Sequence, residues 1–189
     1  MIGLVRRRGV MAKRRGGTAY SFPSNLPLTP TGTNTDPGQS GGLVLATVVQ
    51  STRAGVVATG IRFWMPTEGV GQTLTGFLFA GVTGSTVLAQ SIDATAVAGW
   101  NVLPFTTPYP MTSSVSVSAA IYLRPAAGDG LGNVTYSALA SALTSARVLS
   151  PLQTIATGSR YNYGAPALTG GSDTGSSSAW YGVDVMVTG

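Results

Sequence analysis

The sequence predicts an all-β protein: an antiparallel β-sandwich or jelly-roll-like domain with an extended basic N-terminal arm. Two observations lead to this prediction, and a third describes the surface. Apolar and polar residues alternate over short stretches, which is typical of half-buried strands. Gly, Pro, Asn and Asp separate these stretches, as turns require. Only 9% of the residues are charged, against roughly 25% in an ordinary soluble domain, so uncharged polar side chains must cover the surface.

The chain divides into three zones. Residues 1–17 form a basic arm that ends in two glycines. Residues 18–41 are rich in Pro, Thr and Gly, and because proline fixes φ and lacks an amide hydrogen, we expect an extended segment with few ladder hydrogen bonds. Residues 42–189 form the β-sandwich domain, which is large enough to bury a core of its own.

The earlier strands of this domain follow from apolar runs and from alternation. The first is a short run rich in β-branched residues, and the second carries Val56, Val57, Ile61 and Phe63. The third alternates an apolar or small face with a face that contains both of its phenylalanines, and a short fourth strand comes next. These stretches are residues 43–50, 54–64, 74–81 and 87–92.

Three further stretches predict the later strands. The first of them runs from a tryptophan to a phenylalanine, and the second opens with strict Ser/Val alternation. The last places Val183, Val185 and Val187 on one face and Asp184 on the other. These stretches are residues 100–105, 113–123 and 180–188.

Two stretches of the domain do not show strand patterns. Residues 137–149 hold Leu139, Leu143 and Ala146 at helical spacing among many alanines, so either a short helix or an irregular crossover is expected there. Residues 165–178 are dominated by Gly and Ser, which indicates a surface loop.

The positive charge of the chain is confined to the arm. Of the 11 Lys and Arg residues, the first 15 positions hold six. The remainder of the chain has five basic residues against six acidic ones, a net charge of −1, so the overall charge of +5 belongs to the arm. The basic arm residues are Arg6, Arg7, Arg8, Lys13, Arg14 and Arg15.

The residue inventory argues against an enzyme. The chain has no Cys and no His, so it lacks thiolate chemistry, zinc thiolate sites and the commonest general base. The acids are scattered singly, and Asp184 is expected to face solvent or to pair with an arginine. The glycine-rich segment 128–133 offers too few oxygens for calcium and predicts a plain turn. We expect no catalytic residue, no metal and no cofactor.

The aromatic residues are the candidates for contact with a ligand or a partner. They could stack on sugars or anchor an interface, or each could close the sandwich core. For Trp64 and Trp100, which lie inside strand patterns, the core position is favoured. The candidates for glycan or interface contact are Tyr161, Tyr163, Trp180 and Tyr181.

Several short segments, taken in order along the chain, resemble a known family. They include the segment from Gly60 to Trp64, the pair Gly99-Trp100, the segment from Tyr161 to Gly164 and the segment from Trp180 to Val185. Together they resemble an uncharacterised β-sandwich domain family of bacterial surface proteins and tailed-phage virion proteins. The resemblance implies no catalytic residues. The whole chain also resembles accessory phage virion proteins, either head decoration or minor tail proteins.

These observations favour a structural virion protein, assembled in the host cytoplasm. Its arm would dock on capsid or tail subunits, and the domain would form a homo-oligomer such as a trimer. The alternative is a carbohydrate-binding module that attaches a virion or a cell surface to a host glycan. Nucleic acid is the less favoured partner because the charge stays within the arm. No apolar run reaches the roughly 18 residues that a membrane span needs, and no signal peptide is expected because no apolar segment follows the basic one.

Overall fold

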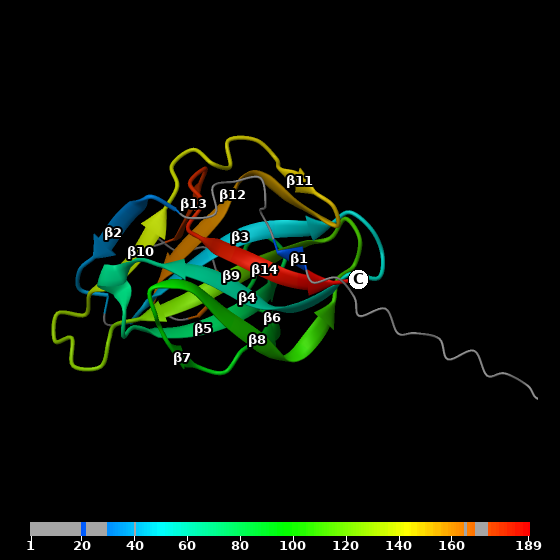
Figure 1. The fold of residues 1–189 in the computed structure, drawn as a ribbon. Helices are drawn as coiled ribbons and strands as arrows, with labels where there is room; N and C mark the ends of the chain where they lie inside the picture. The colour runs from blue at the N-terminus through cyan, green and yellow to red at the C-terminus, as the bar shows by residue number, and fades with distance from the viewer. Residues whose placement is uncertain (1–19, 22–29, 40, 165, 169–173) are drawn as a thin grey trace, which may run out of the picture.

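The computed structural model describes residues 20–21, 30–39, 41–164, 166–168 and 174–189. In these ranges the chain folds into antiparallel sheets packed face to face (Figure 1), which confirms the all-β prediction. The helical structure of the described residues is one short 3₁₀ turn, η1 (Thr67–Gly69). Each of the seven stretches predicted as strands overlaps a strand of the structure.

The small sheet has four strands. Their order is β1 (Tyr20–Ser21), β14 (Val183–Thr188), β4 (Val57–Met65) and β8 (Gly99–Pro110). β8 ends the sheet, apart from a single bridge between Ser91 and Phe105. It carries three prolines, Pro104, Pro108 and Pro110.

The large sheet is built around β3. Its main path runs β11 (Val148–Leu149), β12 (Leu152–Tyr163), β3 (Leu43–Ser51), β9 (Ser116–Arg124), β5 (Thr73–Ala80) and β6 (Val87–Gln90). Two short strands extend it: β13 (Thr174–Ser177) pairs with β12, and β7 (Ala94–Thr95) pairs with β5.

A separate two-stranded sheet joins β2 (Gly32–Asp36) to β10 (Val134–Ala138), with five residue pairs in register. β2 lies in the segment that we expected to be poor in ladder hydrogen bonds, so this expectation was wrong for residues 32–36. The reason is local: Pro30 and Pro37 flank the strand, and none of its five residues is a proline, so every amide of the strand keeps its hydrogen.

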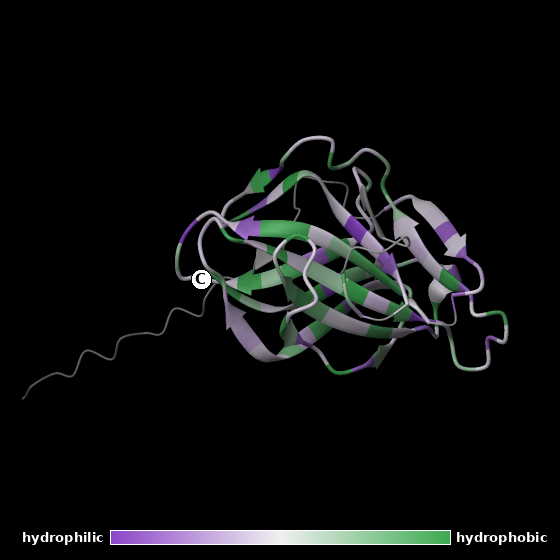
Figure 2. Cartoon of the chain, turned by 180° about the vertical axis from the view of Figure 1, so that it is seen from behind, coloured by the Kyte–Doolittle hydropathy of each residue, from purple (hydrophilic) through white to green (hydrophobic). Residues whose placement is uncertain are grey.

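The core lies between the inner faces of the two main sheets. Val183 and Val185 of β14 and Phe63 of β4 are buried against side chains of the large sheet such as Leu45 and Ile121. Seen from behind, hydrophobic residues recur along the central strands (Figure 2). Gly76 lets the two sheets approach closely, since a Cβ there would lie 3.0 Å from the Cβ of Ile61 in the opposite sheet, a tighter contact than Cβ atoms usually make.

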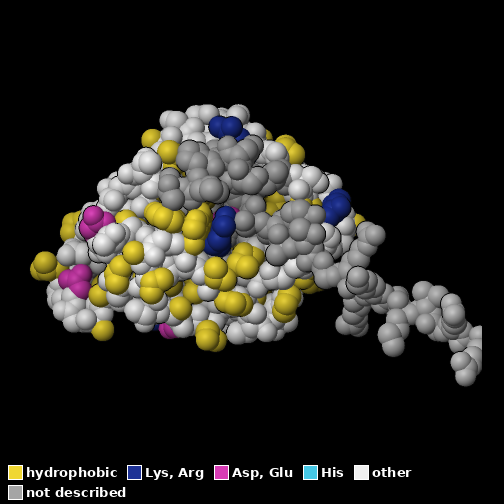
Figure 3. Space-filling model, in the orientation of Figure 1, with side chains coloured by type: hydrophobic (Ala, Val, Ile, Leu, Met, Phe, Trp, Pro, Cys, Tyr) yellow, Lys and Arg dark blue, Asp and Glu magenta, His cyan; other side chains and the backbone are white. Residues whose placement is uncertain are grey.

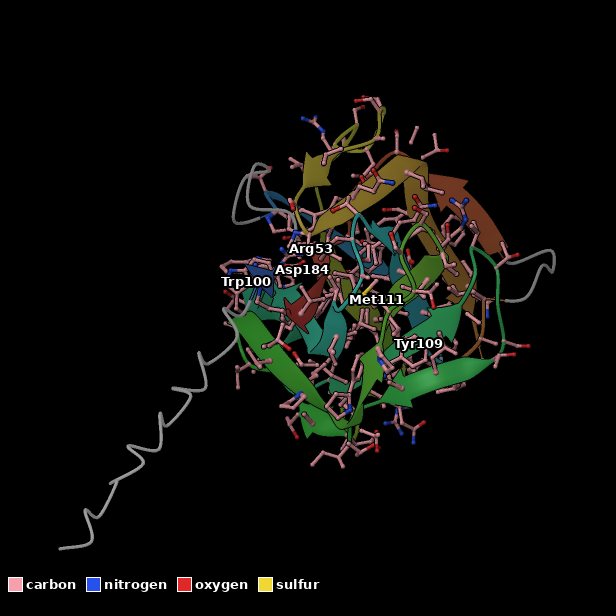
Figure 4. The ribbon with its side chains drawn as sticks, turned by 90° about the vertical axis from the view of Figure 1, so that its right-hand side faces the viewer. Arg53, Trp100, Tyr109, Met111 and Asp184 are labelled. Atoms are coloured by element: carbon pink, nitrogen blue, oxygen red, sulfur yellow. The ribbon has the colours of Figure 1, made fainter. Side chains whose placement is uncertain are left out.

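The sandwich has two distinct ends. At one end, which we call the β1 end, Tyr20 pairs with Val187 and Arg53 Nη2 donates a 2.7 Å hydrogen bond to the carbonyl oxygen of Gly189. Figure 4 looks onto this end and labels Arg53, Tyr109 and Met111. The β2–β10 pair lies at the opposite end, the β10 end (Figure 1).

The structure decides between two alternatives left open by the sequence and corrects one local prediction. Residues 137–149 form no helix: β10 ends at Ala138, and Leu139 exchanges backbone hydrogen bonds of 2.8 and 2.9 Å with Trp180. The irregular crossover is therefore the correct alternative. The predicted surface loop 165–178 contains strand β13 at its end. Within it Leu168 is buried against an apolar cluster on the outer face of the large sheet.

Candidate functional site

The basic arm residues lie outside the described part of the chain, so their prediction stays a prediction. What the structure fixes is the point at which the arm joins the domain: Tyr20, in β1, at the edge of the small sheet. The residues concerned are Arg6, Arg7, Arg8, Lys13, Arg14 and Arg15.

Four tyrosines come together at the β10 end. Tyr161 and Tyr163 lie on the inner face of β12, since they alternate with Asn162, and Tyr181 precedes β14. Tyr136 of β10 completes the group, which we call the tyrosine cluster. With Leu43 and Leu45, these rings line a cavity of about 160 Å³.

Three hydroxyls of the tyrosine cluster bond within the protein. Asp36 Oδ2 accepts hydrogen bonds from Tyr163 (2.9 Å) and Tyr136 (3.3 Å), and Tyr181 bonds to Ser177. Burial, reinforced by Asp36, raises the pKa of Tyr163 to about 12, and burial also raises the pKa of Tyr136 and Tyr181. The phenols therefore stay protonated at neutral pH and can donate to the Asp36 carboxylate.

The tyrosine cluster closes the end of the core rather than offering flat rings to a sugar. The Tyr161 and Tyr163 rings meet edge to face at 6.0 Å, and those of Tyr136 and Tyr181 at 5.9 Å. The cavity is smaller than the roughly 300 Å³ at which ordinary ligand pockets begin. Its chemistry is that of a satisfied hydrogen-bond network.

The fourth predicted aromatic, Trp180, does not join the tyrosine cluster. It is 1% exposed, and its Nε1 donates a 2.8 Å hydrogen bond to the carbonyl oxygen of Val183. Its ring packs with Leu139, Ala142 and Leu143. The structure thus brings together three of the four aromatics named from the sequence, with Tyr136 and Asp36, which the sequence interpretation did not name. The alternation of Val134, Tyr136 and Ala138 was the available signal for Tyr136.

Trp64 and Trp100 lie on the outer face of the small sheet and are half-buried, so their predicted core position was wrong. Strand alternation explains this, because Phe63 and Leu103 take the inward positions. The two tryptophan rings meet nearly edge-on at 5.6 Å.

An ion pair lies beside these tryptophans. Arg62 Nη2 is 2.7 Å from Asp184 Oδ2, and the guanidinium lies 4.0 Å from the centre of the Trp100 ring. Asp184 and Trp100 are labelled in Figure 4. The arginine partner expected for Asp184 is confirmed, and the carboxylate side chain is fully buried.

The glycine-rich segment 128–133 forms the turn that the sequence predicted. Asp129 Oδ1 accepts the amide hydrogen of Leu131 (3.0 Å), and Oδ2 accepts that of Asn133 (2.9 Å). Within the described ranges, no three His, Cys, Asp or Glu side chains gather where they could hold a metal ion.

None of the helical segments in the described part of the chain is long and apolar enough to cross a bilayer.

Comparison with known proteins gives a fold but no family. No protein-family model matches the sequence, and no curated protein matches it. The clostridial cysteine protease Cwp84 after propeptide cleavage is similar in structure, with a TM-score of 0.60 and 9% identity over 90% of this chain and 40% of that one. The likeness shows the fold.

Two further structures are similar to this chain. One holds the cysteine protease and lectin-like domains of Cwp84, a surface layer associated protein of Clostridium difficile: TM-score 0.50, 10% identity, 82% of this chain and 36% of that one. The other is the infectious bursal disease virus VP2 subviral particle: TM-score 0.37, 16% identity, 97% of this chain and 45% of that one. This chain therefore spans less than half of each.

Proposed function

We propose that this protein is a non-enzymatic structural component of a bacteriophage virion, a capsid decoration or minor tail protein. Its basic arm anchors it to capsid or tail subunits, and its β-sandwich is displayed outward. The observation that carries the proposal is the partition of charge. All of the net positive charge lies in residues 1–17, while the rest of the chain has a net charge of −1.

The surface of the domain supports a role in a dense assembly. Charged side chains are few and well separated on the face shown in Figure 3. Such a surface produces little repulsion between neighbouring copies. A symmetric homo-oligomer such as a trimer is part of the proposal.

The two ends of the sandwich suggest how an anchored domain would be oriented. The arm joins the domain at Tyr20 at the β1 end, and the tyrosine cluster lies at the β10 end. A protein anchored through its arm would hold the β10 end away from the particle.

Deleting residues 1–17 tests the anchor. We expect the truncated protein to fold normally, since the deletion stops short of β1, and to be lost from purified particles. A second variant changes all six arm charges to Gln while keeping the length of the arm, and the matched control changes the five arginines to Lys, which keeps the charge. Particle composition measured by mass spectrometry gives the result.

Normal incorporation of both the truncated protein and the Gln variant would overturn the anchor. Incorporation of the Lys control alone would show that charge, rather than arginine geometry, does the anchoring.

A second candidate function is attachment to a carbohydrate on a host surface. A hollow on the outer face of the large sheet, lined by residues of β5, β6 and β9, favours it. The two functions are compatible because the arm and the hollow are separate parts of the chain.

A further inference from the structure

A groove of about 530 Å³ crosses the outer face of the large sheet. Its floor includes Phe77 and Tyr122 of β5 and β9, and its walls include Gln90 of β6 and the following residues Ile92 and Asp93. Arg124 closes one side. We call this hollow the Asp93 groove. Unlike the cavity of the tyrosine cluster, it falls in the size range of ordinary ligand sites.

An exposed ion pair forms the polar part of the groove. Asp93 Oδ2 lies 2.6 Å from Arg124 Nη2, with side-chain exposures of 57% and 36%. Thr75 holds the pair in place: its hydroxyl bonds to Asp93 Oδ1 at 2.5 Å and to Arg124 Nη2 at 3.1 Å. The carboxylate and the guanidinium therefore stand side by side at the surface.

This pair offers an acceptor beside a donor. A carboxylate has about four acceptor positions and a guanidinium five N–H donors, so both keep unused capacity after these contacts. Two neighbouring hydroxyls of a sugar match the arrangement, because one can donate to Asp93 while the other accepts from Arg124. The exposed Gln90 amide on β6 adds one more donor and acceptor.

The remaining groups fit the body of a saccharide. The half-buried Tyr122 ring, with the Arg124 guanidinium 5.4 Å from its centre, and the 73% exposed Ile92 provide apolar surface for C–H groups. The Asp93–Arg124 pair has no net charge, which favours a neutral ligand over an anion. The hydrogen bond from Arg124 lowers the pKa of Asp93, so the carboxylate stays an ionised acceptor at neutral pH.

We propose that the Asp93 groove binds a neutral saccharide with neighbouring free hydroxyls. This inference rests on the second candidate function, attachment to a carbohydrate, and places it in a groove that sequence reasoning did not single out. Of the tyrosines named from the sequence, Tyr163 and Tyr181 bond to Asp36 and Ser177, whereas the groove keeps exposed donors and acceptors.

The test uses the full chain on an array of neutral and anionic saccharides. Free D-mannose, D-galactose, D-glucose and N-acetylglucosamine are then titrated and followed by saturation-transfer NMR. Asp93→Ala should weaken binding at least about tenfold and Gln90→Ala about threefold, as expected for the loss of a charged and a neutral hydrogen bond. Asn34→Ala, which removes an exposed amide on β2 outside the groove, is the matched control and should bind like the original protein.

Three results would overturn the proposal: no binding to any neutral saccharide at millimolar concentration, stronger binding to anionic ones, or binding that survives Asp93→Ala and Gln90→Ala. Loss of binding in Tyr161→Ala alone would move the site to the tyrosine cluster. Circular dichroism shows that each variant is folded. Failure of saccharide binding is distinct from failure of the anchor, which is measured by incorporation into particles.

Discussion

The outer faces of the two main sheets each carry an arginine–aspartate pair, and the two pairs are nearly identical in local geometry. Arg62–Asp184 on the small sheet closes at 2.7 Å, and Arg124–Asp93 on the large sheet at 2.6 Å. Each guanidinium lies near an aromatic ring, at 4.0 Å from Trp100 and 5.4 Å from Tyr122. They differ in burial, because the Asp184 side chain is fully buried and that of Asp93 is 57% exposed.

This difference assigns the two pairs to different tasks. A buried carboxylate depends on its partner, since removing the partner leaves a charge without compensation in a medium of low dielectric. An exposed pair adds little to stability because water and salt screen it. We therefore interpret Arg62–Asp184 as part of the fold and Arg124–Asp93 as part of a surface available to a ligand.

The largest expected effect comes from breaking the buried pair. Arg62→Ala should lower the free energy of unfolding by about 3 kcal/mol, because it removes the Arg62 guanidinium from the buried Asp184 carboxylate and from the face of the Trp100 ring. Urea unfolding followed by tryptophan fluorescence measures the change. The control is the double variant Arg62→Met with Asp184→Leu, which should recover much of the loss since it removes both charges. A loss below about 1 kcal/mol would show that Arg62–Asp184 contributes no more to stability than an ordinary surface ion pair.

A smaller effect is expected from the exposed pair. Arg124→Ala should cost about 1 kcal/mol or less. The cost should shrink in about 1 M salt, where the screening length falls to about 3 Å, while the Arg62→Ala cost should persist. Urea unfolding of both variants at low and high salt gives the comparison. Equal salt sensitivity in the two variants would erase the distinction between the faces.

The smallest expected effect is on stability at low pH. The pKa of Asp93 is lowered in the folded protein, chiefly by the hydrogen bond from Arg124 and then by that from Thr75. Its stabilisation is therefore complete above the unfolded value of about 4 and is lost as the pH falls through the lowered folded value. Asp93→Asn should flatten this part of the stability profile, measured by urea unfolding between about pH 6 and pH 2. An unchanged acid slope in Asp93→Asn would show that the contact is not maintained in solution.

Sequence patterns were sufficient where successive residues of a strand alternate between the core and the outer face of the sheet, even in β5, which is buried on both faces. The valines of β14 and the alternating residues of β5 and β9 fall where period two puts them. Period-two alternation does not hold along β12. That strand contains a register shift between Thr154 and Ser159, and Thr157 has a φ of 48°, so its polar and apolar residues lose their alternation. β2 was missed because its composition is that of a turn and its pairing depends on β10.

The candidate sites likewise could be predicted from the sequence only in part. That Tyr161 and Tyr163 share a face follows from their spacing, but Asp36 lies more than 120 residues earlier in the chain. Asp93 and Arg124 come together only because β5 and β9 pair and Thr75 bridges the carboxylate and the guanidinium. Contacts of this kind depend on strand order and register, which are properties of the whole fold.

The three prolines of β8 limit how copies of this protein can join. Pro104, Pro108 and Pro110 leave three positions of this border strand without an amide hydrogen. A strand from another molecule therefore cannot pair along the length of β8 and continue the small sheet. Even at high local concentration, molecules would remain separate folded units along this border. Regular association through this border would have to use side chains rather than strand pairing.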